Sequence, residues 1–239
     1  REGWHFASIP EQKQSPLTKP GRLIWYNPYD QVAVTDIYDR QVKAGEDHTN
    51  VLVMRLTPSG SDHKSSWGGV MRALSKGSYD QSKIQFIELR MRGSLGVLHL
   101  DLGEITEDLP DSNGLTNGKL DTEDQNKNGR LDFNEDTGLD LMLDSAEQRE
   151  CGCSDSDPHG DDWAYSSNDP RNYERINGTE KNGLDPGING RPDTEDLDGN
   201  GALDNKDNYY SYSIDLAAGE NVVPKSERNG WYTVRIPFT

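Results

Sequence analysis

The feature of this sequence that most limits how it can fold is a repeated acidic segment. Residues 121–136 read DTEDQNKNGRLDFNED and residues 191–208 read RPDTEDLDGNGALDNKDN, so the two copies of Asp-Thr-Glu-Asp lie 72 residues apart. Each copy contains D-x-[DN]-x-[DN]-G, in which oxygen-bearing side chains alternate before a glycine. A segment with so few apolar side chains does not build a hydrophobic core, and it therefore needs another source of order.

Alternating Asp and Asn side chains on a tightly turning loop suit calcium, which takes about six to eight oxygen ligands at about 2.4 Å. We therefore predict two or more calcium ions, with Gly129 and Gly201 at the sharp turn of each loop. In loop order, the expected ligands are Asp124, Asn126, Asn128, the carbonyl of Arg130, Asp132 and Glu135 in the first loop, and Asp196, Asp198, Asn200, the carbonyl of Ala202, Asp204 and Asp207 in the second.

A shorter form of the same pattern precedes each loop. Asn117-Gly118 leads to Asp121 and Asp124, and Asn189-Gly190 leads to Asp193 and Asp196, so Asp121 and Asp193 are expected as further ligands. The last acid of each half-loop, Asp124 or Asp196, would then be the first ligand of the loop that follows. The Gly, Asn and Pro residues of these stretches oppose the entering helix of an EF-hand. Overlapping loops of this kind resemble thrombospondin type 3 repeats, which are strings of calcium sites without an apolar core.

The closing position of the second loop is the weakest part of the pattern. Asp207 has a shorter side chain than Glu135, so we expect the second site to be weaker or to be completed by a distant residue. A third site, with irregular spacing, is expected from the acids between the two loops: Asp155, Asp157, Asp161 and Asp162.

The charge of the chain is concentrated in this region. Residues 101–208 hold 29 Asp and Glu and 9 Lys and Arg, a net charge of −20, whereas the remainder holds 13 acids and 16 bases, a net charge of +3. The density favours cations as partners and disfavours nucleic acid, because phosphate contacts need basic patches. We also expect no helical membrane span, because no run of about 18 apolar residues occurs.

Outside the acidic segment, short runs that alternate apolar and polar residues predict β-strands. We expect an all-β fold, an antiparallel jelly-roll-like (galactose-binding-like) sandwich that forms a single domain over 1–239. In this reading residues 1–20 are an extended leading segment, 105–208 are a long calcium-binding insertion, and 140–150 form the one short helix. The expected strands are 23–26, 51–56, 67–74, 87–91, 98–102, 212–216 and 232–238, with 87–91 and 98–102 paired as a hairpin.

No catalytic motif stands out, so we expect the chain not to be an enzyme. With 29 acids in one segment, carboxylates fall at glycosidase separations by chance, and Ser61-x-x-Lys64 lacks the companion motifs of penicillin-recognising enzymes. Cys151 and Cys153 close too small a ring to staple a domain, and nothing assigns them a redox or metal role. The aromatic residues Trp163, Tyr165 and Tyr173 are expected to form a small satellite core, with a sugar-stacking platform as the alternative.

Several longer motifs, in this order, resemble the SprA/Sov family, the gliding-motility and type IX secretion outer-membrane translocon proteins of Bacteroidetes. The resemblance runs from about Leu23 to Phe238 and includes IWYNPYD (24–30), NVLVMRLTP (50–58), SWGGVMRAL (66–74), FIELRMRGSLGVLHLDLGEITED (86–108), LDTEDQNKNGRLDFNEDTGLD (120–140), GDDW (160–163), RINGTE (175–180), RPDTEDLDGNGALD (191–204) and YYSYSIDL (209–216). The chain is too short and too polar to be the membrane conduit itself, and its start at Arg1 suggests a piece of something longer.

The resemblance implies a calcium-stabilised, non-catalytic soluble domain with a structural or protein-interaction role in protein export. Such a domain is expected at the outer membrane, on its extracellular or periplasmic face. Its partners would be other type IX secretion components or the rest of the same translocon chain. The alternative is a calcium-dependent carbohydrate-binding module or cell-surface adhesin domain, which the jelly-roll-like strands and the candidate exposed rings Trp25, Trp163, Tyr209 and Tyr210 favour.

Overall fold

A computed structural model of the chain describes residues 3–10, 13, 19–59, 66–74, 83–111, 114–183 and 191–237. Strands outnumber helices in the described residues, and all strand pairs but one are antiparallel, which confirms the expected all-β class. The chain divides into two compact units, the first formed by 1–26, 52–73 and 105–207 and the second by 27–51, 74–104 and 208–239. Phe238, the Asn189-Gly190 pair and the Ser61–Lys64 motif lie outside the described residues.

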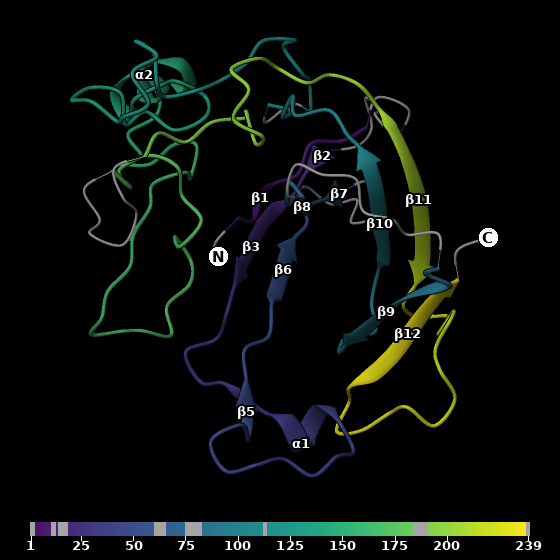
Figure 1. Ribbon diagram of the computed structural model, residues 1–239. Coiled ribbons are helices and arrows are strands. Elements are labelled where there is room, and N and C mark those ends of the chain that lie inside the picture. Colours follow the sequence, from purple (N-terminus) through teal and green to yellow (C-terminus); the bar gives the residue numbers. More distant parts are fainter. Residues whose placement is uncertain are drawn as a thin grey trace. The chain divides into compact units, whose positions relative to one another are not determined.

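The first unit contains three short ladders near its N-terminus (Figure 1). Its apolar core is small and comes from Ile9 and from Leu23, Ile24 and Trp25 of β3, with the ring of Phe6 edge-on to Trp25 at 4.7 Å. The ladders are β1 (His5–Phe6) with β8 (Val70–Met71), β2 (Lys19–Pro20) in parallel with β7 (Ser66–Trp67), and β3 (Arg22–Tyr26) with β6 (Val53–Thr57).

The second unit is built on two longer ladders that share one apolar core. Ile214, Val234 and Ile236 are buried at its centre, and alternate residues of all four strands surround them. Period-two alternation gives each strand one apolar face, which explains why the ladders bury that face together. The ladders are β9 (Phe86–Met91) with β12 (Tyr232–Pro237) and β10 (Val97–Glu104) with β11 (Asn208–Asp215). The unit also holds β4 (Val32–Ala33), α1 (Val34–Ile37) and β5 (His48–Thr49).

The expected hairpin between 87–91 and 98–102 is wrong. β9 pairs with β12, placing Ile87 opposite Ile236, and β10 pairs with β11, placing Leu100 opposite Tyr212. The connection between β9 and β10 contains Gly93-Ser94, a pair typical of tight turns, but it is five residues long, and so this pair does not by itself fix a hairpin register. Cross-strand apolar pairs with distant segments decide the pairing instead.

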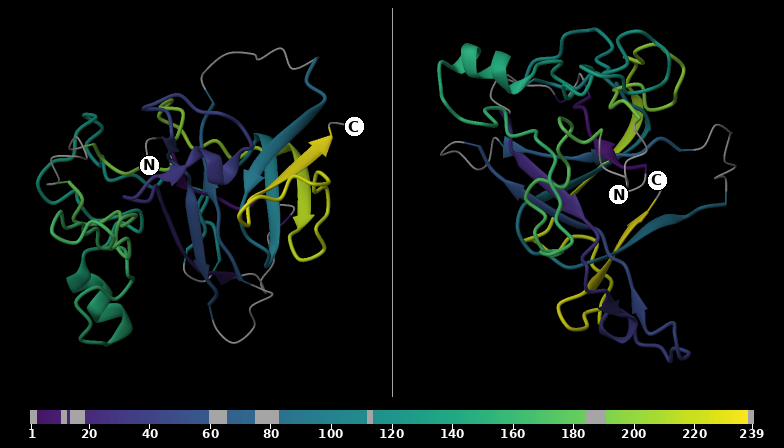
Figure 2. Two further views of the ribbon diagram at one scale, coloured as in Figure 1. Left: turned by 90° about the horizontal axis from the view of Figure 1, so that it is seen from below. Right: turned by 90° about the vertical axis from the view of Figure 1, so that its left-hand side faces the viewer.

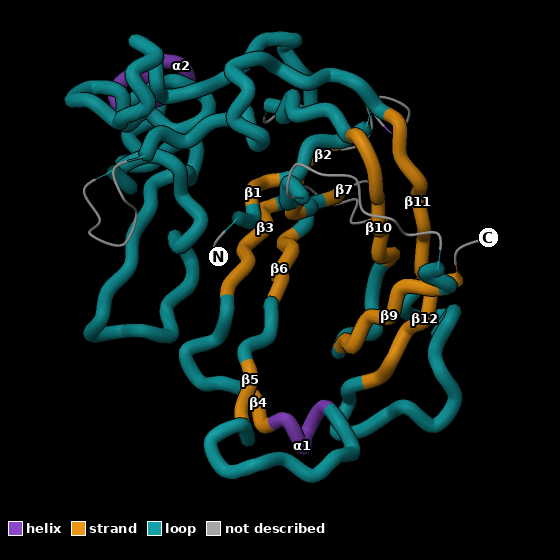
Figure 3. The backbone as a smooth tube through the Cα atoms, in the orientation of Figure 1, coloured by secondary structure: helices purple, strands orange, loops and turns teal. Residues whose placement is uncertain are grey.

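The acidic segment, residues 105–207, belongs entirely to the first unit and consists mainly of loops and turns (Figures 2 and 3). Its helix is α2 (Asp144–Cys151), which begins four residues later than expected and ends at Gly152 with a left-handed φ of 61°. Directly at this end, Cys151 and Cys153 form a disulfide. The short helix α1 was not expected from the sequence.

The acidic segment is attached to strand β3 within the first unit. The side chain of Asn177 accepts a hydrogen bond from the Trp25 amide at 2.9 Å and donates one to the Trp25 carbonyl at 3.0 Å, as a neighbouring strand would. Tyr173 stacks on Tyr26 with ring centroids 3.8 Å apart. Tyr173 therefore packs on strand β3, whereas Tyr165 of the expected satellite core is 44% exposed.

Candidate metal centre

The first predicted calcium loop forms a tight turn around Asp124. The Asp124 carboxylate accepts hydrogen bonds from the amides of Asn128 at 2.9 Å and Gly129 at 2.8 Å. Lys127 and Gly129 both have left-handed φ angles, of 60° and 74°, and these angles turn the chain sharply enough for alternate side chains to converge. The position expected to need glycine therefore does adopt the conformation that glycine favours.

The second loop repeats this geometry around Asp196. Its carboxylate accepts from the amides of Asn200 at 2.9 Å and Gly201 at 2.7 Å. Gly199 and Gly201 have φ angles of 72° and 78°, matching the two left-handed residues of the first loop. The sequence repeat is thus also a repeat of backbone conformation.

Side chains within each loop converge on the acid at its ninth position. Asn126 and Asn128 each donate to the Asp132 carboxylate at 2.7 Å, and these hydrogen bonds lower the pKa of Asp132. In the second loop Asn200 donates to Asp204 at 3.0 Å. The predicted third-, fifth- and ninth-position residues therefore lie together in the first loop, and the predicted fifth- and ninth-position residues lie together in the second.

The closing acids of the two loops come from different places. Glu135 closes the first loop in sequence, accepting from the amides of Asn126 at 3.3 Å and Asp132 at 2.9 Å. In the second loop Glu107 accepts from the amides of Leu197 at 3.0 Å and Asp204 at 3.3 Å.

In the structure, Glu107 therefore occupies the closing position of the second loop, for which the sequence spacing predicts Asp207. Asp207 instead accepts from the amide of Thr106 at 2.9 Å, next to Glu107 itself. One oxygen each of Glu107, Asp196 and Asp198 lie within 4.8 Å of one another. An Asp where the first loop has Glu is the sequence signal that the acid completing this loop is distant.

A third loop of the same design is assembled from separated residues. The Asp108 carboxylate accepts from the amides of Asn117 at 3.2 Å and Gly118 at 2.8 Å, and Asn117 donates to Asp121 at 2.7 Å. Glu195 closes it, accepting from the amides of Leu109 at 2.7 Å and Asp121 at 2.8 Å. Asp121 therefore has the place of a ninth-position ligand, as the half-loop pattern indicated.

A fourth loop centres on Asp136 and uses the other predicted half-loop acid, Asp193. The Asp136 carboxylate accepts from the amides of Asn182 at 3.3 Å and Gly183 at 3.1 Å, and the Asn182 side chain donates to Asp193. Glu123 closes this loop, accepting from the Asp193 amide at 2.7 Å and also from the amides of Thr137 and Gly138. Sequence reasoning missed Glu123, Glu195, Asp108 and Asp136 because their hydrogen-bond partners lie 9 to 86 residues away along the chain, at spacings that no single loop motif contains.

The two copies of Asp-Thr-Glu-Asp lie side by side and exchange their glutamates. Thr122 and Thr194 form an antiparallel bridge, the Glu123 amide donates to the Asp193 carbonyl at 3.0 Å, and the Glu195 amide donates to the Asp121 carbonyl at 3.0 Å. Each copy thus supplies the closing acid of a loop whose ninth-position acid belongs to the other copy.

The interior of the acidic segment is made of carboxylates. Among its described residues no hydrophobic side chain is buried. Burial raises the pKa of Glu123 and of Glu195, each to about 7, although amide hydrogen bonds oppose the shift. No ion pair with Lys or Arg involves any of the four closing glutamates within the described part of the chain. The buried acids are Glu107, Asp108, Glu123, Glu135, Glu147, Asp157, Asp162, Glu180 and Glu195.

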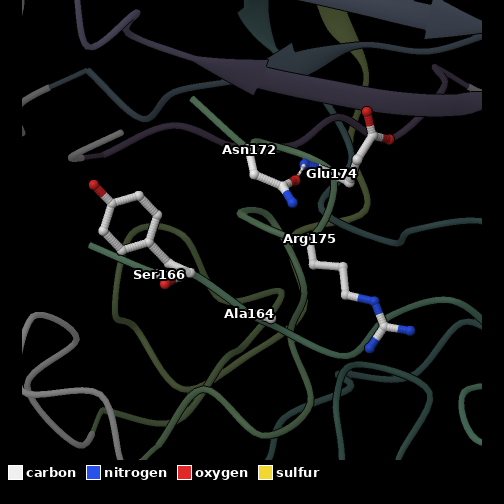
Figure 4. A pocket seen from close by; sticks show the side chains of 6 residues that line it. Ala164, Ser166, Asn172, Glu174 and Arg175 are labelled. Carbon is white, nitrogen blue, oxygen red and sulfur yellow. Dashed lines mark hydrogen bonds between the residues drawn. The ribbon is translucent and has the colours of Figure 1, made fainter. Parts of the chain in front are cut away.

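A shallow hollow of about 270 Å³ lies within the same segment, between residues 164–166 and 172–175 (Figure 4). Tyr165, 44% exposed, and Asn172, Glu174 and Arg175 are among its lining residues. The Asn172 side chain accepts from the Glu174 amide at 3.2 Å, so it is already engaged.

Fold and loops together define a β-rich protein with an acidic segment of oxygen-donor loops. Comparison with models of known protein families and with curated proteins finds no match for this chain. No helix in the described ranges has the length and apolar character needed to cross a membrane.

Proposed function

We propose that this chain is a calcium-stabilised, non-catalytic soluble domain of a type IX secretion and gliding outer-membrane translocon, with a structural or protein-interaction role in protein export. The observation that carries the calcium part is the carboxylate interior of residues 105–207. A buried carboxylate without a counter-charge is strongly unfavourable, whereas calcium bound by several carboxylates offsets both their repulsion and their desolvation.

The four loops offer calcium the oxygen donors that it prefers. Each combines a first-position Asp, a side-chain amide, a ninth-position Asp and a closing Glu, which makes three carboxylates per loop, and Asp198 adds a fourth in the second loop. The first two loops are complete in side-chain ligands, with Asn126 and Asp198 at the third position. Calcium therefore acts in this proposal as a brace that orders the segment, and the expected ion count is two or more.

The translocon part rests on the ordered motif resemblance, and so does an outer-membrane location on the extracellular or periplasmic face. The finer fold, one jelly-roll-like sandwich over the whole chain, is part of the same proposal. The two ladders that share the core around Ile214 and Val234 support it, because face-to-face packing of antiparallel ladders is the basic unit of a sandwich.

Two experiments test the two parts separately. For calcium, elemental analysis of the purified chain and thermal unfolding with and without EGTA should show bound calcium and a large loss of stability on chelation. An unchanged melting curve with no calcium found would refute the brace. For the translocon, deleting the coding region of these residues in a host strain should impair secretion of cargo that carries the C-terminal export signal. Normal secretion would refute that role.

A carbohydrate-binding or adhesin function is the second candidate, and the hollow beside Tyr165 favours it. An exposed ring with amide and guanidinium groups around it is a common arrangement for stacking and hydrogen-bonding a sugar. Against it, Trp25 is only 4% exposed, although Tyr210 is 73% exposed. A glycan array probed in calcium decides the question, since this function requires calcium-dependent hits that Tyr165→Ala removes.

A further inference from the structure

A second group of buried acids lies between α2 and the two segments that follow it. Glu147 on α2 is 0% exposed and Glu180 is 1% exposed, and the third member of the group, Asp161, is half-buried. One carboxylate oxygen from each of the three lies within 4.8 Å of the others. None of these residues belongs to the four loops described above.

Backbone hydrogen bonds fix these three acids in place. The Asp161 carbonyl accepts from the amides of Thr179 at 2.8 Å and Glu180 at 3.1 Å, and the Glu180 carbonyl accepts from the Trp163 amide at 2.8 Å. On the helix side, one oxygen of Glu147 accepts from the His159 amide at 3.1 Å. The three side chains therefore converge because the main chain holds them, as in a preformed binding site.

Each of these three acids has one buried oxygen without a hydrogen-bond donor. Glu147 Oε1, Asp161 Oδ1 and Glu180 Oε2 are buried and accept no hydrogen bond within the described structure. A buried acceptor without a partner is unfavourable by about 1–3 kcal/mol, and more when it carries charge. Three such oxygens in one group of acids are therefore unfavourable unless a cation binds them.

The neighbouring basic groups are bound to other acids. Lys181 pairs with Asp144 and with Asp162, where the Nζ–Oδ1 distance is 2.7 Å. His159 Nδ1 contacts Asp140 and lies 3.8 Å from Glu147 Oε1. Neither basic side chain makes an ion pair with Asp161 or Glu180 in the described part of the chain.

We propose that Glu147, Asp161 and Glu180 form an additional calcium site, separate from the four loops. All three donors are carboxylate oxygens, the type of ligand that a hard cation such as calcium prefers. Zinc sites typically use nitrogen and sulfur donors instead. A divalent ion can also stabilise the negative charge of three carboxylates. Carbonyl oxygens or water molecules would complete its coordination shell. The site links α2 to the segments around Asp161 and Glu180, so its ion fixes the helix on the rest of the acidic segment.

Counting bound calcium by native mass spectrometry, after chelation and reloading of the whole chain, tests this site. Glu180→Gln keeps the shape of the side chain and removes one charge, so it should bind one ion fewer than the unmodified chain. The matched control is Glu150→Gln on the exposed side of α2, which should leave the count unchanged. Asp124→Asn in the first loop should remove a different ion, so the double variant with Glu180→Gln should lose two.

The outcomes separate this site from the loops. A count that falls with Asp124→Asn but not with Glu180→Gln overturns the additional site and leaves the calcium brace intact, whereas a count that falls with neither refutes both. If Glu180→Gln does not fold, the calcium count of Asp161→Asn, compared with that of the unmodified chain, still tests the site. Crystals of the unmodified chain soaked with terbium should show an anomalous peak among the three carboxylates, and its absence would refute the site. Zinc binding there without calcium binding, abolished by His159→Gln, would also overturn it.

Discussion

Replacing Glu107 with Gln tests whether the second loop is closed by a residue from outside it. Glu107 is 6% exposed, and its two oxygens accept from the amides of Leu197 and Asp204. Gln keeps the size but turns one of these acceptors into a donor facing an amide, and it removes one of the carboxylates available to the ion. The comparison variant is Asp207→Asn, at the residue that the loop spacing selects.

The structure sets different magnitudes for the two changes. Losing one charge-assisted hydrogen bond and weakening the other should lower the free energy of unfolding by about 2–3 kcal/mol in calcium. For a chain of this size that corresponds to a fall in melting temperature of roughly 4–12 °C. Asp207→Asn keeps an acceptor for the Thr106 amide, so we expect a loss of only about 0.5–1 kcal/mol, or roughly 1–4 °C.

Thermal unfolding followed by circular dichroism, in excess calcium and in excess chelator, measures both variants. Burial raises the pKa of Glu107, which means that its charged form is unfavourable when no ion compensates it. The cost of Glu107→Gln should therefore shrink or change sign in chelator, whereas that of Asp207→Asn should stay small in both. Equal or reversed losses in calcium would show that Asp207, and not Glu107, closes the loop.

Three further predictions concern pH, backbone strain and attachment. In chelator, the free energy of unfolding should rise as the pH falls from 8 to 5, because folded pKa values of about 7 for Glu123 and Glu195 exceed the unfolded ones; urea titrations that show a loss over this range would contradict it. Gly201→Ala should lower the free energy of unfolding in calcium by about 1–2 kcal/mol, and with it the melting temperature, because an alanine at a φ of 78° is strained. No atom lies within 4 Å of the added Cβ, so this strain is the only expected cause, and an unchanged melting temperature would count against the loop conformation. Asn177→Ala removes both hydrogen bonds to Trp25 and should cost about 1–3 kcal/mol by chemical denaturation, while Asn168→Ala serves as its exposed control.

The two contiguous loops could be read from the sequence because their contacts are local. Asp124 and Asp196 bind amides four and five residues ahead, so the letters D-x-[DN]-x-[DN]-G contain the whole geometry. The longer strands were predicted for the same reason, since alternation is a property of neighbouring residues. The single strand expected at 67–74 is wrong, because β7 and β8 are two short strands that pair with different partners. Their pairing was not, because β9 and β12 are joined only by cross-strand contacts between distant segments.

The closing acids show where local reasoning ends. In the sequence, the Glu of Asp-Thr-Glu-Asp has no feature that distinguishes it from the other acids. Only its position opposite the second copy of the repeat makes it the closing residue of another loop. Glu123 and Glu195 are the third residue of each repeat, and an internal repeat was the one available signal that they act as a matched pair. Glu107 has no such signal beyond the shorter Asp207, which indicates that something else completes the second loop.

The exchange of glutamates also explains how a segment without an apolar core can hold one conformation. Each of Glu123 and Glu195 is fixed by amides of its own loop and by the amide of an acid in the other copy, so neither loop can close independently of the other. In a hydrophobic core, cooperativity arises because many side chains share one interior. Here it arises because each carboxylate serves two chain segments at once, and a cation at one loop lowers the entropy that ordering the other loop would lose. Both copies of the repeat are therefore needed. One copy alone would have a glutamate with no loop to close, and its own loop would have no glutamate to close it.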